Sequence, residues 1–137
     1  SRVRAAQGSR MTQELTRILY VEDDPDIQAI AVMVLETISG FVLEPCSSGS
    51  EALQKAVAFK PDLILLDVMM PGMDGPETLK GLRAFPELAR TPVVFMTAKV
   101  QPQEVEAYLN LGALGVIAKP FDPMTLAQEL RDIWARQ

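Results

Sequence analysis

The chain has 137 residues, enough for one domain, and its 18 acidic and 13 basic residues give a net charge of −5, which argues against direct nucleic-acid binding by this domain. Histidine is absent, so the usual general base and the commonest transition-metal ligand are both missing. The single cysteine, Cys46, rules out an intramolecular disulfide and fits a cytoplasmic setting, and no apolar run approaches the roughly 20 residues that span a bilayer.

The chain begins with a segment that differs from the rest. Residues 1–10 contain three arginines, no acidic residue and no apolar periodicity, and Met11 follows them. We interpret residues 1–10 as a vector-derived leader, with a native disordered arm as the alternative. The folded domain is therefore expected to span residues 11–137.

Five short apolar runs alternate with five helical patterns along this domain. The strands expected from the runs are residues 17–21, 41–46, 63–67, 92–96 and 114–118. The helices expected after them begin near residues 25, 49, 75, 103 and 123, and three of these starts pair an N-terminal proline with a capping residue or a turn glycine. Alternating strands and helices predict a parallel sheet with helices on both faces and right-handed crossovers.

Apolar spacing predicts which side of each helix faces the sheet. The first helix has a long stripe at helical spacing, made of Ile27, Ile30, Ala31, Val34, Leu35 and Ile38. The fourth helix, near residues 103–111, has a shorter one, made of Val105, Tyr108 and Leu109. The last helix is expected to begin at Asp122-Pro123.

The residues suited to chemistry stand where strands are expected to end. These positions hold Glu22 and Asp23, Asp67, Thr97 and Lys119. With the strand order 2-1-3-4-5, the first and third strands flank the reversal at which a binding crevice opens, and the three carboxylates converge there. Three carboxylates repel one another unless a cation lies between them, and oxygen ligands without His or Cys select Mg²⁺.

Asp67 is the candidate nucleophile. A carboxylate beside Mg²⁺ can attack phosphorus and form an aspartyl phosphate. Lys119 would neutralise the phosphoryl oxygens, while the Thr97 hydroxyl and the Ala98 backbone N–H would donate hydrogen bonds to them. By itself, the acidic run at residues 22–24 also fits a solvated charge cluster that caps the first helix.

Four blocks of sequence resemble the signatures of bacterial response-regulator receiver domains, the family that includes chemotaxis regulators. The resemblance covers the chain from about residue 16 to its end. The blocks are Val21-Glu22-Asp23-Asp24-Pro25, Leu66-Asp67-Val68-Met69-Met70-Pro71-Gly72-Met73-Asp74-Gly75, Met96-Thr97-Ala98 and Ala118-Lys119-Pro120-Phe121. The resemblance implies a flavodoxin-like fold with the order 2-1-3-4-5.

The resemblance also implies a chemistry. Asp67 would accept a phosphoryl group from the phosphohistidine of a sensor kinase or a phosphotransfer protein. Asp23 and Asp67 would bind Mg²⁺ directly, Glu22 mainly through water, and the backbone carbonyl of Met69 would be a further ligand. Lys119 would pair with the acceptor carboxylate and later with the phosphoryl group, and its bond to Pro120 would be cis.

The resemblance also implies a switch. Thr97 would move inward when phosphate arrives and would reshape the face made by the fourth helix, the fifth strand and the last helix. Val116 departs from the pattern, because many members have Tyr or Phe there that moves together with the threonine. The phosphorylated state must then be transmitted to a partner without an aromatic side chain at this position. Met69 and Lys99 occupy positions that tune the lifetime of the phosphate. Glu22 replaces the commoner Asp and should preserve metal binding.

The implied protein is a signalling switch that catalyses its own phosphorylation and dephosphorylation rather than a metabolic enzyme. Its partners would be the kinase and either a downstream target or a fused output domain, with homodimer formation through the reshaped face as a further expectation. One alternative is a haloacid-dehalogenase-type phosphohydrolase, but Met69 stands where that family has its second Asp. The other is a degenerate receiver that acts only as an interaction module.

Overall fold

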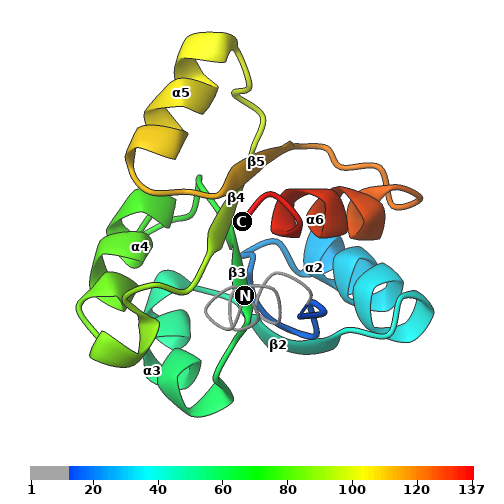
Figure 1. Ribbon diagram of the computed structural model, residues 1–137, viewed down its shortest axis with the longest axis horizontal. Helices are drawn as coiled ribbons and strands as arrows, with labels where there is room; N and C mark the ends of the chain where they lie inside the picture. Colours follow the sequence, from blue (N-terminus) through cyan, green and yellow to red (C-terminus); the bar gives the residue numbers. More distant parts are fainter. Residues whose placement is uncertain (1–12) are drawn as a thin grey trace, which may run out of the picture.

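The computed structural model describes residues 13–137, which form a parallel sheet between two layers of helices (Figure 1). Its strands are β1 (Arg17–Val21), β2 (Val42–Cys46), β3 (Leu63–Asp67), β4 (Val93–Thr97) and β5 (Gly115–Ala118). All neighbouring pairs are parallel and the order is β2-β1-β3-β4-β5, so the predicted fold and strand order are confirmed. The predicted leader, residues 1–10, lies outside the described residues.

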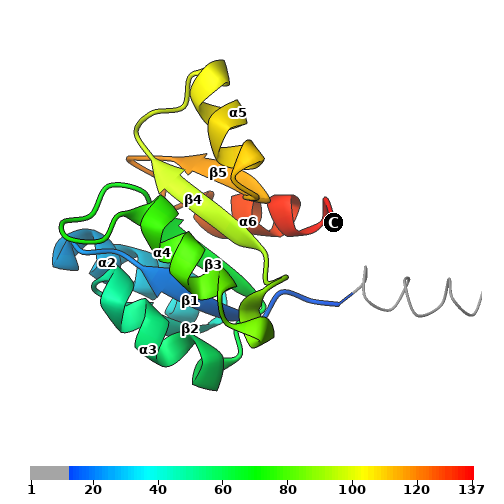
Figure 2. The same ribbon diagram turned by 90° about the vertical axis from the view of Figure 1, so that its left-hand side faces the viewer.

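Helices cover both faces of the sheet, as predicted. They are α2 (Pro25–Val32) with the π-helical η1 (Met33–Ile38), α3 (Gly49–Phe59), α4 (Gly75–Arg83), α5 (Pro102–Asn110) and α6 (Leu126–Trp134). Figures 1 and 2 show α3 and α4 on one face, α2 and α6 on the other, and α5 standing out beyond β4 and β5. No helix within residues 13–137 has both the length and the apolar character needed to cross a membrane.

The central strand β3 is buried along its whole length, because both of its faces are covered. Side chains alternate between two apolar clusters, as the two-residue period of a strand requires. On β1, for example, Ile18 and Tyr20 face α2 and α6, whereas Leu19 and Val21 face α3 and α4. The sheet core therefore fixes the strand ends, where the polar residues stand.

The first helical segment departs from the predicted stripe. It becomes a π-helix over η1, which adds a residue to the turn and rotates the face presented to the sheet. Ala31, Val34 and Leu35 are buried as predicted, but Ile30 is exposed and Ile38 is 71% exposed. The stripe prediction was therefore wrong at those two positions.

The last helix begins later than predicted. Asp122 and Pro123 start a turn, in which the Asp122 carboxylate accepts a hydrogen bond from the Met124 N–H at 2.9 Å. The Asp122 carbonyl then accepts from the N–H of Leu126 at 3.0 Å, and α6 begins at that residue with Thr125 as its N-cap. The prediction that Asp122 caps the last helix was therefore wrong, since its carboxylate closes the turn that precedes the helix.

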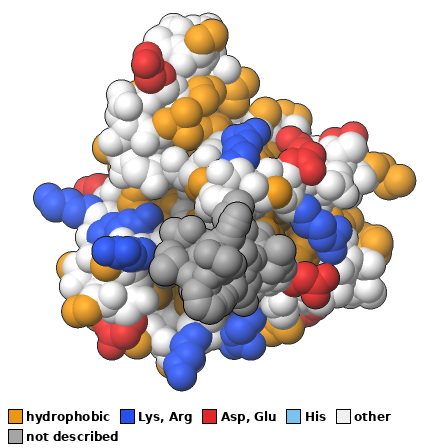
Figure 3. All heavy atoms as spheres, viewed as in Figure 1, with side chains coloured by type: hydrophobic (Ala, Val, Ile, Leu, Met, Phe, Trp, Pro, Cys, Tyr) orange, Lys and Arg blue, Asp and Glu red, His pale blue; other side chains and the backbone are white. Residues whose placement is uncertain are grey.

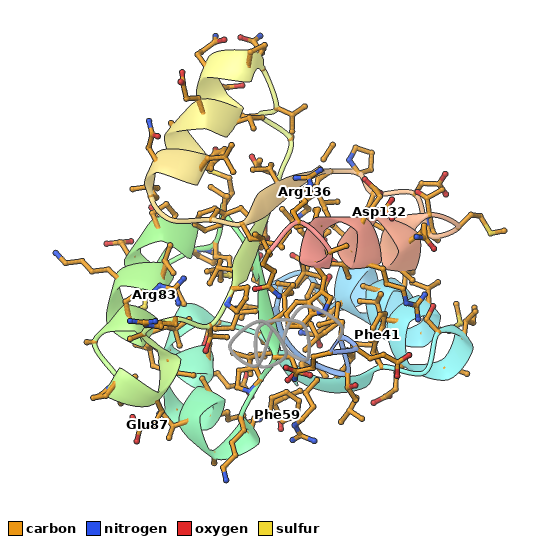
Figure 4. The ribbon with its side chains drawn as sticks, viewed as in Figure 1. Phe41, Phe59, Arg83, Glu87, Asp132 and Arg136 are labelled. Atoms are coloured by element: carbon orange, nitrogen blue, oxygen red, sulfur yellow. The ribbon has the colours of Figure 1, made fainter. Side chains whose placement is uncertain are left out.

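The irregular connection predicted between α4 and β4 contains a short 3-10 helix, η2 (Pro86–Leu88). Arg83, labelled in Figure 4, donates hydrogen bonds from one nitrogen to the carbonyls of Leu88 at 2.8 Å and Thr91 at 2.6 Å. One half-buried cation thus satisfies two loop carbonyls that regular structure would otherwise pair.

Candidate functional site

The first acidic residues of the site follow β1. The Glu22 N–H donates to the Cys46 carbonyl at 3.0 Å, and the Gln28 side-chain amide donates to the carbonyls of Glu22 at 3.1 Å and Cys46 at 3.0 Å. Asp24 caps α2 by accepting from the N–H groups of Asp26 and Ile27. The Glu22 side chain is only 1% exposed, and Asp23 beside it is more accessible.

Asp67 ends β3 and is 2% exposed. The loop after it returns so that the Gly75 N–H donates to the Val68 carbonyl at 2.8 Å. A Cβ atom at position 75 would lie 2.7 Å from the Asp67 carbonyl oxygen, so only glycine allows this approach. The close packing of Gly75 fixes the start of α4 against the end of β3.

Lys119 follows β5 and reaches back to both buried acids. Its backbone N–H donates to the Thr97 carbonyl at 2.9 Å, and the Lys119-Pro120 bond is cis, as predicted. Its Nζ lies 3.1 Å from Oε1 of Glu22 and 3.2 Å from Oδ2 of Asp67. The contact with Asp67 follows the expectation, whereas the direct ion pair with Glu22 was not predicted.

The electrostatics of the site follow from this geometry. Burial and the negative charge of Glu22 together raise the pKa of Asp67 to about 7, although Lys119 acts in the opposite direction. Burial alone lowers the pKa of Lys119, but its hydrogen bond to Glu22 and the charge of Asp67 raise it above its ordinary value. Two buried acids and one cation leave a site that is short of positive charge.

Carboxylate oxygens of Glu22, Asp23 and Asp67 lie within 4.8 Å of one another, as predicted from the strand ends. Among residues 13–137, Oδ2 of Asp67 is buried without a well-aligned hydrogen-bond donor. An unsatisfied buried oxygen in an acidic cluster is what a bound cation relieves. The donor set is all oxygen, which suits a hard ion such as Mg²⁺.

Thr97 ends β4 next to Asp67, since Asp67 pairs with Met96 in the sheet. It is buried, and its hydroxyl accepts a hydrogen bond from the Lys99 N–H at 3.0 Å. Ala98 and Lys99 are exposed at the rim, and the Met69 side chain is exposed in the loop after Asp67. Thr97 therefore belongs to the cluster of strand ends, with the rim residues outside it.

Sequence reasoning missed two features of the site. Gln28 ties the ends of β1 and β2 together through its amide, and Glu22 shares Lys119 with Asp67. Gln28 lies one turn into a helix that starts at the strand end. This position could have indicated that its side chain reaches the ends of the strands. The longer side chain at Glu22, relative to Asp, was the signal for the second feature.

The fold and the motifs agree with comparisons to known proteins. A model of the response regulator receiver domain matches residues 18–131. The DNA-binding response regulator MtrA of Mycolicibacterium smegmatis is 38% identical over 115 residues, which are 84% of this chain and 49% of that protein. The alkaline phosphatase synthesis transcriptional regulatory protein PhoP of Bacillus subtilis is 38% identical over 120 residues, 88% of this chain and 49% of that protein. The chain thus spans about half the length of these relatives.

Solved structures give the same picture. The chemotaxis protein CheY4 of Vibrio cholerae superposes with a TM-score of 0.80 at 32% identity, covering 88% of this chain and 99% of that one. The signal receiver domain of a histidine kinase from Syntrophus aciditrophicus gives a TM-score of 0.74 at 33% identity, covering 88% of this chain and 91% of that one.

Proposed function

Because this chain belongs to the response regulator receiver domains, we propose that it is a phosphorylation switch whose acceptor is Asp67. Receiver domains work in two-component signalling, which implies a histidine kinase as partner. The observation that carries the proposal is the buried Asp67 carboxylate, 3.2 Å from Lys119 and within 4.8 Å of two further acids.

The proposed reaction transfers a phosphoryl group from a phosphohistidine to Asp67. An oxygen of the Asp67 carboxylate attacks phosphorus, an O–P bond forms, and the N–P bond to the imidazole breaks. The imidazole nitrogen leaves with the electron pair and takes up a proton. Hydrolysis of the aspartyl phosphate by water later returns the carboxylate and inorganic phosphate.

Glu22, Asp23, Asp67 and the backbone carbonyl of Met69 would hold the metal, and their oxygen donors fit Mg²⁺. When bound, Mg²⁺ supplies positive charge against the phosphoryl oxygens. The residues of the chain do the rest: Lys119 neutralises a phosphoryl oxygen, and the Thr97 hydroxyl and the Ala98 N–H donate to the others.

Thr97 is also proposed to move when the phosphoryl group is present and to change the face made by α5, β5 and α6. Val116 is half-buried in β5 and lacks the aromatic ring that many family members use in this change. Met69 and Lys99 are exposed, follow Asp67 and Thr97 by two residues, and would tune the access of water and hence the phosphate lifetime.

We propose that a groove beside the site is the surface that contacts the kinase or phosphotransfer protein. Lys119 lines a mostly apolar groove of about 140 Å³ together with Ile27, Ile30, Pro120, Phe121 and Pro123. This groove suits the apolar side of a kinase or phosphotransfer protein that presents its phosphohistidine to Asp67. We further propose that the domain spans residues 11–137 and acts in the cytoplasm. It would signal to a target protein or an output domain, and it would form a homodimer through α5, β5 and α6.

The test is incubation with Mg²⁺ and acetyl phosphate, followed by mass spectrometry of the intact protein. We expect a gain of one acid-stable, base-labile phosphate in the native protein and in Asp26→Asn, which changes an exposed acid outside the site, and none in Asp67→Asn. A gain that survives Asp67→Asn would refute the assignment. No gain at all would favour a pure interaction module, and steady release of phosphate from phosphate monoesters would favour a phosphohydrolase.

A further inference from the structure

Helix α5 packs only lightly on the body of the protein. None of the residues from Pro102 to Asn110 is buried. Tyr108, half-buried, is the α5 residue that packs against the apolar cluster under α3 and α4 in the described part of the chain. Nearby, Val100, Leu109 and Leu111 are 43%, 44% and 53% exposed, and Figure 3 shows hydrophobic side chains gathered on the lobe that α5 forms. Leu109, which shares the predicted stripe with Val105 and Tyr108, is thus exposed.

Tyr108 makes its contact with a residue of the strand that leads to the site. Its ring and that of Phe95 have centroids 5.4 Å apart and planes inclined by 53°, a favourable tilted arrangement. Phe95 is fully buried in β4. Phe95 and Thr97 are two residues apart on the same strand, so their side chains lie on the same face of the sheet. The aromatic pair thus lies directly next to Thr97 along β4.

The neighbouring strand offers no competing aromatic contact. Val116 pairs with Phe95 in the register of β4 and β5, and it is half-buried. Its short side chain cannot place a ring between Thr97 and the protein surface. On this face, the contact between Phe95 and Tyr108 packs α5 against β4.

We propose that Tyr108 is the positioning residue through which the state of Asp67 sets the position of α5. The inference rests on the proposed phosphorylation of Asp67. A shift of Thr97 toward the phosphoryl group changes the end of β4 and with it the packing of the Phe95 ring on Tyr108. Because α5 has no buried residue of its own, a change at this one contact is enough to move or loosen the helix.

Hydrogen exchange of the α5 amides tests the proposal, measured with Mg²⁺ alone and with Mg²⁺ plus acetyl phosphate. In the native protein we expect phosphorylation to change α5 exchange by at least about fivefold, the lower end of ordinary allosteric coupling. Tyr108→Phe keeps the ring and Leu109→Ala alters an exposed neighbour, so both should keep the change. Tyr108→Ala should take up phosphate normally and lose the change.

The outcomes separate the two hypotheses. If Tyr108 only anchors α5, Tyr108→Ala speeds exchange equally in both states and the phosphate-dependent ratio survives, which overturns the inference while leaving the proposed function intact. Loss of the ratio in Tyr108→Phe overturns it too, because the ring contact would then not be the connection. Failure of the native protein to gain phosphate overturns both, and mass spectrometry of the same samples identifies that case.

Discussion

The carboxyl edge of β1 and β3 and the helix α5 are neighbours built in opposite ways. At the edge, Glu22 and Asp67 are almost fully buried, and Lys119 bridges them from a third strand. On α5 no residue is buried, and the ring of Tyr108 packs against Phe95 of β4. Asp67 is therefore held more tightly than the helix, and we expect a modest change in free energy at the edge to alter α5 without displacing Asp67.

The largest expected effect comes from breaking the support of the edge. Leu65 is fully buried in the middle of β3, so Leu65→Ala should lower the free energy of unfolding by about 2–5 kcal/mol through lost burial and a residual cavity. Leu109→Ala on α5 should change it by less than about 0.5 kcal/mol. Urea denaturation measures both, and similar losses at the two positions would remove the contrast.

The next largest effect is expected in the pH dependence of the free energy of unfolding of the metal-free protein. The folded state binds the Asp67 proton more tightly than the unfolded chain, because its pKa is about 7 instead of the ordinary 3.8. The free energy of unfolding should therefore fall as pH rises from about 4 to about 7, by roughly 3 kcal/mol, and stay lower above that range.

Thermal or urea unfolding in chelator across this pH range measures the loss. Asp67→Asn should flatten the dependence, and Mg²⁺ should restore stability at neutral pH because it binds the folded state. A metal-free protein whose stability rises over this range would contradict the raised pKa of Asp67.

The smallest effect is expected on the affinity of the protein for Mg²⁺. Asp23→Asn removes one carboxylate at the accessible side of the cluster and should weaken Mg²⁺ binding by at least about tenfold, with little change in α5. Calorimetric titration measures the affinity, and Asp26→Asn is the matched control. Unchanged affinity in Asp23→Asn would remove Asp23 from the ligand set.

The sheet and the position of the site were predictable because they depend on short-range patterns. Apolar runs such as residues 63–67 identify buried strands, and the alternation of strands with helices determines a parallel sheet. Polar residues at strand ends must then share one edge. Glu22, Asp23 and Asp67 met there for this reason, and their roles as metal ligands stay predictions.

The structure differs from the sequence predictions where it depends on properties that apolar spacing does not report. The π-helix η1 depends on which carbonyl each N–H selects, and one extra residue per turn was enough to expose Ile38. The ion pair between Glu22 and Lys119 joins residues 97 apart and depends on side-chain length. Leu109 belongs to the predicted apolar stripe of α5 but is exposed, whereas Tyr108 of the same stripe packs against Phe95.

The approach of Gly75 to Asp67 bears on how the molecule divides mechanically. With no room for even one methyl group between them, the first turn of α4 and the end of β3 can move only together. The start of α4 is therefore coupled mechanically to the strand that carries Asp67, in contrast to α5, whose residues are all at least partly exposed.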